Sequence, residues 1–137
     1  MAEAMFKELI KNIDGENNIN IISAGTWAIN GQKASKHAIE SLAHKNIDLN
    51  SHMSKPLTRE MVEEADLILT MTTNHKMQII HGIPDSKEKV YTLKEYAYET
   101  VDDIDISDPY GQEIEIYKAC ADEIEAALKK VISKYFK

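Results

Sequence analysis

The stretch that decides the fold of this 137-residue chain is residues 66–71, with the sequence DLILTM. Its apolar residues Leu67, Ile68 and Leu69 follow one another without the polar alternation that a half-exposed strand shows. A run of this kind predicts a strand with both faces covered, as in parallel sheets with helices on either side.

Helices and strands alternate along the chain on either side of this strand. A short helix capped by Thr58 precedes it, and a second short helix starts at Thr73 and stops near Gly82. Residues 90–93 then predict another strand.

The two ends of the chain continue the pattern. Residues 19–22 (INII) predict a strand, and helical spacing of apolar residues predicts a helix over residues 34–45. An amphipathic helix opens the chain, and the longest helix closes it, with a stripe formed by Ile114, Tyr117, Ala121, Ile124, Leu128 and Ile132.

Strands that alternate with helices predict an α/β domain with a parallel sheet and right-handed crossovers. Folds of this class bind ligands at the carboxyl ends of their strands. Functional residues are therefore expected at residues 23–27, at residues 70–74 and in the loop after Leu93.

Composition excludes several classes of protein. The net charge of −7 and a pI near 5.2 argue against binding to nucleic acid or to an anionic membrane surface. No membrane-spanning run or export signal is visible, and the single cysteine, Cys120, cannot form an internal disulfide. These features favour a cytoplasmic protein.

The loop VDDIDISDPYG, residues 101–111, is rich in aspartate. Counted from Asp103, the sixth and twelfth positions hold Asp108 and Ile114 where a calcium loop needs Gly and Glu, so calcium is rejected at this spacing. A solvated acidic loop is the simpler interpretation. Within it, Pro109 holds Asp108 in a defined place beside Tyr110, which suits a general acid but equally a plain turn before the last helix.

No metal or cofactor site is predicted. No pair of the five histidines has the spacing of a helical metal site, and no glycine-rich loop is placed to hold a phosphate. Cys120 lies in the last helix beside the apolar stripe, so packing is its expected role. The first helix lacks a capping residue, which leads us to expect that a preceding segment is missing.

The ordered set MAEAMFKEL, ISAGTWAINGQKASKHAIESL, SHMSKPLT, ADLILTMT, VYTLKEY and DPYGQEIEIYK resembles the low-molecular-weight protein tyrosine phosphatase family, and most of all its bacterial protein arginine phosphatase branch. The resemblance covers essentially the whole chain. It implies a single domain over residues 1–137 with a three-layer, doubly wound parallel sheet. It also implies that the first strand and the phosphate loop, a Cys and an Arg separated by five residues, are absent ahead of Met1.

In the family, a thiolate attacks phosphorus while backbone N–H groups and the Arg hold the phosphate oxygens. The resemblance makes Asp108 the general acid, Trp27 and Tyr110 the aromatic walls of the substrate pocket, and Ser23 and His52 the side chains that brace the loop. It implies a phosphorylated protein as the substrate and no cofactor. Without the nucleophile and the Arg, we expect no turnover from the chain as given.

Other interpretations remain open from the sequence. A non-catalytic pseudophosphatase or protein-binding module would keep the pocket walls, and an α/β domain with coincidental motifs is the plainest alternative. The choice between phosphotyrosine and phosphoarginine is not decided, although Tyr110-Gly111 hints at phosphoarginine. Loss of a central strand would leave the domain barely stable, unless self-association as a homo-oligomer or strand exchange fills its place.

Overall fold

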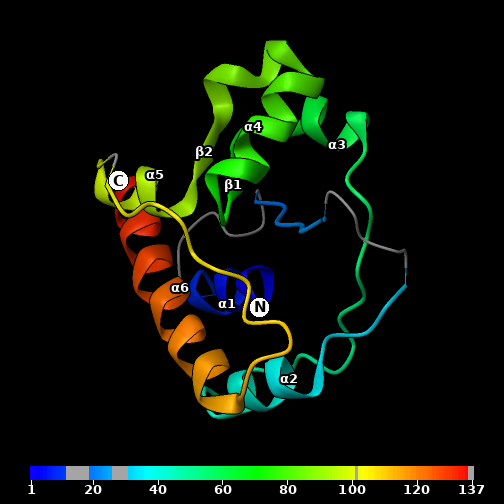
Figure 1. Cartoon of the computed structure of the whole chain (residues 1–137), viewed down its shortest axis with the longest axis vertical. Helices are drawn as coiled ribbons and strands as arrows, with labels where there is room; N and C mark the ends of the chain where they lie inside the picture. The colour runs from blue at the N-terminus through cyan, green and yellow to red at the C-terminus, as the bar shows by residue number, and fades with distance from the viewer. Residues whose placement is uncertain (12–18, 26–30, 101, 136–137) are drawn as a thin grey trace.

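The computed structural model describes residues 1–11, 19–25, 31–100 and 102–135, in which two short strands lie among the helices (Figure 1). In chain order the elements are α1 (Ala2–Leu9), α2 (Lys36–Ala43), α3 (Arg59–Glu64), β1 (Ile68–Thr70), α4 (Thr73–Gly82), the 3-10 helix η2 (Pro84–Lys89), β2 (Val90–Thr92), α5 (Leu93–Tyr98) and α6 (Ile114–Tyr135).

The two strands pair in parallel, which confirms the predicted α/β fold with a parallel sheet. Ile68 lies opposite Val90, and Thr70 lies opposite Thr92. The strands are shorter than predicted, because β1 contains only the middle of residues 66–71 and Leu93 already belongs to α5. Because the two strands run in the same direction, their carboxyl ends meet at one edge of the sheet.

Both faces of β1 are covered, as the run of apolar residues predicted. Successive side chains of a strand point to opposite faces. Ile68 packs against a cluster formed by Val62, Ile79 and Val90. Its neighbour Leu69 packs on the other face, against the larger core around α6. The sheet is thus the middle layer of three.

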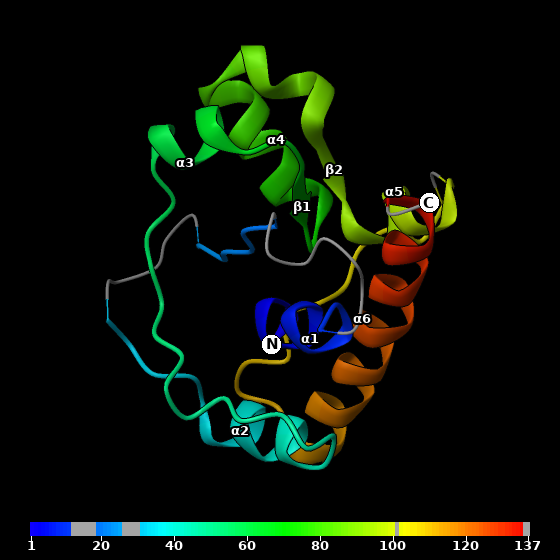
Figure 2. The same cartoon turned by 180° about the vertical axis from the view of Figure 1, so that it is seen from behind.

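Helix α6 organises the larger core. It packs against α1, α2 and α5, and Figure 2 shows α1 lying across the middle of the molecule beside it. Four residues of the predicted stripe are buried on one face of α6, namely Tyr117, Ala121, Ile124 and Leu128, whereas Ile114 and Ile132 are half-buried. Cys120, Ala127 and Val131 complete this buried face. Met5 of α1 and Leu42 of α2 are fully buried against the same core.

The prediction of a strand at residues 19–22 is wrong. Residues 19–24 form no ladder with other described residues, and the first β contact in this segment is an isolated bridge between Gly25 and Pro56. Ile22 is 48% exposed. A short apolar run becomes a strand only where a neighbouring strand offers its backbone N–H and C=O groups.

The start of α3 follows the predicted cap, and a second threonine that was not predicted caps α4. The hydroxyl of Thr58 accepts a hydrogen bond from the Met61 N–H at the start of α3, and Thr72 caps α4 in the same way. Helix α1 has Met1 at its cap position without a side-chain cap hydrogen bond. Helix α5 was not predicted, although Thr92 and Glu95 form a capping box at its start.

Candidate active site

The acidic loop is fastened to the carboxyl end of β1. The Asp105 carboxylate accepts hydrogen bonds from the backbone N–H and the hydroxyl of Thr73, at 2.7 and 2.8 Å. The backbone N–H of Ile106 donates to the Met71 carbonyl at 2.7 Å. The loop that carries Asp108 is therefore held at the edge where functional residues were expected.

Asp108 itself lies at the surface, at the start of a turn that leads into α6. Its Oδ1 accepts a hydrogen bond from the Tyr110 N–H at 3.0 Å. Gln112 N–H donates to the Pro109 carbonyl at 2.9 Å, and Gly111 has a φ of +81°, which glycine adopts without strain. The carboxylate thus has a defined position on an exposed turn.

Ser23 and His52, the two predicted bracing residues, both lie beside Glu3, which no sequence pattern had singled out. Ser23 Oγ donates to Glu3 Oε1 at 2.9 Å, and His52 Nδ1 lies 3.8 Å from Glu3 Oε2. Glu3 also pairs with Lys7 at 3.0 Å. Glu3 lies in the first turn of α1, where a carboxylate is favoured by the helix dipole, and that position was the available signal.

Burial and charge shift the titration of this cluster. Burial alone would raise the pKa of Glu3, but hydrogen bonds from Lys7 and Ser23 outweigh it and hold that pKa below its usual range. Burial, followed by the positive charge of the Met1 amino group, lowers the pKa of His52. Glu3 therefore favours its charged form here, and His52 its neutral form.

Of the two predicted aromatic walls, Trp27 and Tyr110, the structure describes only Tyr110. Tyr110 is 78% exposed, and Trp27 lies outside the described residues. Two pockets, one beside Tyr91 and one beside Leu57, are lined by other residues. The assignments of these residues to catalysis and binding stay predictions.

The only cysteine and the only arginine of the chain lie in different helices. Cys120 is buried in α6, with its Sγ 3.9 Å from the Ser107 carbonyl, and burial followed by the charge of Glu123 raises the pKa of its thiol. Arg59 pairs with Glu63 in α3 at 2.9 Å. Neither side chain has the setting of a low-pKa nucleophile or of a phosphate clamp.

The described residues provide neither a metal site nor a membrane-spanning helix. Over residues 1–11, 19–25, 31–100 and 102–135, no group of three or more His, Cys, Asp or Glu side chains is placed to hold a metal ion. None of the helices within these ranges is long and apolar enough to span a bilayer.

Comparison with known proteins identifies the family to which this chain is similar. The sequence profile of the family described as "Low molecular weight phosphotyrosine protein phosphatase" matches residues 1–137. The chain is 45% identical over 131 residues to a protein-arginine-phosphatase of Bacillus subtilis, covering 96% of this chain and 84% of the relative. It is 30% identical over 125 residues to a probable low-molecular-weight protein-tyrosine-phosphatase, EpsP, of Ralstonia nicotianae, covering 91% and 79%.

The three-dimensional comparison points the same way. A solved structure of the arginine phosphatase YwlE, a mutant with a phosphorylated active-site serine, superposes with a TM-score of 0.90 at 42% identity. The match covers 99% of this chain and 86% of that one. The similarity thus extends over nearly the whole chain in both sequence and fold, and this chain belongs to the low-molecular-weight phosphotyrosine protein phosphatase family.

Proposed function

We propose that this chain is a single domain of a protein phosphatase that works through a phosphocysteine, and that residues 1–137 alone have no turnover. The match to the phosphatase family over residues 1–137 supports the first part of this proposal. The separation of Cys120, buried in α6, from Arg59, paired within α3, supports the second. Phosphoryl transfer of this kind needs a thiolate and an anion-holding cradle in one place. The family's loop with Cys, five residues and Arg would supply both.

Asp108 is the proposed general acid and base. It would protonate the leaving group as the thiolate attacks phosphorus, and would then take a proton from the water that hydrolyses the phosphocysteine. Two features support this role. The Asp108 carboxylate is exposed, and its loop is fastened to the carboxyl end of β1 through Asp105 and Ile106. Tyr110 and Trp27 are the proposed walls for the substrate.

The proposed substrate is a phosphorylated protein, with phosphoarginine preferred to phosphotyrosine. The relative named as an arginine phosphatase is 45% identical to this chain, whereas the relative named as a tyrosine phosphatase is 30% identical. Ser23 and His52 are the proposed braces behind the catalytic loop, acting with Glu3. We place the protein in the cytoplasm, where a lone cysteine such as Cys120 stays reduced.

Turnover assays test the proposal. The chain as given and a chimera that carries the first strand and loop of the Bacillus subtilis relative ahead of Met1 are compared on p-nitrophenyl phosphate and on a phosphoarginine protein. We expect activity only from the chimera, with phosphoarginine hydrolysed faster. The control is the same chimera with Ser in place of the introduced Cys.

The Asp108→Asn change in the chimera tests the general acid separately. A positioned proton donor contributes about 10²–10⁴-fold, so turnover of the phosphoester should fall by that order. Glu113→Gln, an exposed acid beyond the same turn, is the matched control and should leave turnover unchanged. Equal turnover of Asp108→Asn and the parent chimera would remove Asp108 from the mechanism.

A protein-binding role without hydrolysis is the second candidate. Tyr110 projects 78% of its surface into solvent from a turn anchored by the buried Pro109, and a rigid exposed aromatic ring suits protein recognition. This candidate predicts that the chimera, too, fails to hydrolyse either substrate. Binding of a phosphorylated protein to the chain as given, lost in Tyr110→Ala, would then support it.

Self-association is a separate proposal about assembly. Among the described residues β1 pairs only with β2, so its other edge offers backbone groups for a second copy of the chain. Light scattering after size exclusion should show a dimer or larger species for the chain as given and a monomer for the chimera. A monomeric chain as given would refute strand exchange.

A further inference from the structure

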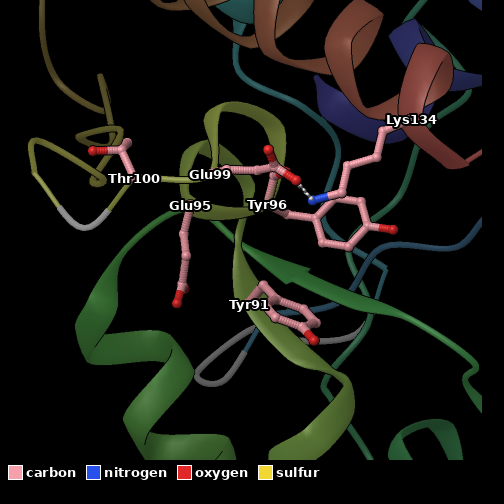
Figure 3. A pocket seen from close by; sticks show the side chains of 6 residues that line it. All are labelled: Tyr91, Glu95, Tyr96, Glu99, Thr100 and Lys134. Carbon is pink, nitrogen blue, oxygen red and sulfur yellow. Dashed lines mark hydrogen bonds and ion pairs between the residues drawn. The ribbon is translucent and has the colours of Figure 1, made fainter.

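An aromatic pocket lies between β2, α5 and the end of α6 (Figure 3). The rings of Tyr91 and Tyr96 stand 5.2 Å apart between centroids and are tilted by 59°. The pocket has a volume of about 390 Å³, and its lining consists of Tyr91, Glu95, Tyr96, Glu99, Thr100 and Lys134. None of these residues belongs to the predicted phosphatase site.

A cation already occupies this pocket. The Lys134 ammonium lies 4.4 Å from the centroid of the Tyr96 ring and 3.0 Å from a Glu99 carboxylate oxygen. It also donates a hydrogen bond to the Tyr96 carbonyl at 3.1 Å. An aromatic face, a carboxylate and a carbonyl oxygen are the three groups that bind organic cations in proteins, and here they converge on one point.

Of the two glutamates that line the pocket, Glu95 and Glu99, only Glu99 pairs with Lys134. Both carboxylate oxygens of Glu95 are held by Lys76 at 2.9 Å, and Figure 3 shows the Glu95 side chain directed away from Lys134. Glu99 instead turns toward Lys134. It has a left-handed backbone, with φ 53° and ψ 43°, at a position where glycine is usual. In this conformation a carboxylate oxygen of Glu99 lies 3.0 Å from the Lys134 ammonium.

The hold of Lys134 on the pocket is exchangeable. Its side chain is 35% exposed and that of Glu99 is 72% exposed, and ion pairs in such settings are weak. The lysine is attached near the end of α6, so its long side chain can leave the pocket while the helix stays in place. An external cation would then meet the same aromatic face and the same carboxylate.

We propose that this pocket binds an arginine side chain of a partner protein, and that Lys134 is its internal competitor. A planar guanidinium stacks on a tyrosine face and pairs with a carboxylate through two N–H groups, which an ammonium cannot do. The net charge of −7 attracts a basic partner.

Titrations followed by amide NMR test the proposal on the full chain. The probe is N-acetyl-L-arginine amide, and its neutral analogue N-acetyl-L-citrulline amide is the ligand control. The arginine probe should shift the amides of Tyr91, Tyr96 and Glu99 saturably, and the citrulline probe should not. Citrulline binding as tight as arginine would overturn the proposal, because the charge would then have no part in recognition.

Variants separate the competitor from the site. Lys134→Ala should tighten binding about fivefold, since one cation–π contact and one surface ion pair no longer compete. Lys130→Ala removes the same charge from an exposed position of α6 and should leave the affinity unchanged. Equal affinities of these two variants would contradict the role of Lys134.

The carboxylate is tested in the Lys134→Ala background, where no internal lysine confuses the result. Adding Glu99→Gln there keeps the shape of the side chain and should weaken binding about threefold. Because Glu99 is exposed, this variant leaves the fold intact, which circular dichroism checks. An unchanged affinity would exclude Glu99 from the site, and with it the proposal.

Discussion

Ser23 donates a hydrogen bond to Glu3, with 2.9 Å between the Ser23 Oγ and the Glu3 Oε1. This contact joins the segment before the undescribed residues 26–30 to the first turn of α1. His52 approaches the other carboxylate oxygen at 3.8 Å. Two residues that the family resemblance assigned to a common task thus lie beside the same carboxylate.

Replacing Glu3 tests how much this contact stabilises the fold. Glu3→Gln removes the charge that Lys7 and Ser23 satisfy, and we expect the free energy of unfolding at pH 7 to fall by about 1–2 kcal/mol. Glu8→Gln, whose carboxylate pairs with Lys11 at the surface of the same segment, should change it by less than about 0.5 kcal/mol. Urea unfolding measures both.

The effect of Glu3 should disappear in acid. The pKa of Glu3 in the folded state is below its ordinary value of 4.5, so its contribution is complete above that pH and is lost as the pH falls through the folded-state pKa. The gap between Glu3→Gln and the parent chain should close at low pH. A gap that persists there would show that shape, and not charge, underlies the contact.

His52 should make the protein sensitive to mild acid. Its pKa in the folded state is below the ordinary 6.5, so the unfolded chain takes up a proton at this residue first and stability falls as the pH drops below 6.5. His52→Gln should reduce the loss of stability between pH 7.5 and pH 5.5. His81→Gln, at an exposed position of α4, is the control, and an equal loss in both variants would contradict the assignment.

The buried stripe of α6 should dominate stability. Leu128 is 2% exposed in the larger core, and Leu128→Ala should lower the free energy of unfolding by about 2–5 kcal/mol. Ile116→Ala, at a 49% exposed position of the same helix, should cost far less. If the two variants melt at the same temperature, α6 does not pack as described.

Local patterns predicted the fold best where they carry their own signal. Thr58 and the stripe that includes Leu128 identified the start of α3 and the buried face of α6, because caps and helical spacing are encoded within a few residues. The prediction of a strand at residues 19–22 was wrong, because strand pairing depends on a distant strand that a short apolar run does not specify. The capping box of Thr92 and Glu95 is encoded just as locally, although α5 was not predicted from it.

The site was predicted less completely than the fold. Asp108 lies on a loop held at a strand end, as expected, but the fastening through Asp105 depends on a contact with Thr73, 32 residues away in sequence. Glu3 was missed for the same reason, because Ser23 and His52 reach it only in three dimensions. Spacing within a motif carries no information about such partners.

Intact-mass spectrometry after acid quench tests the central claim most directly. The chain as given and the chimera with the family loop are each mixed with p-nitrophenyl phosphate, quenched and digested to locate any added phosphoryl group. The account predicts a phosphoryl adduct on the introduced cysteine of the chimera and none on the chain as given. A phosphoryl group on Cys120 of the chain as given would contradict it.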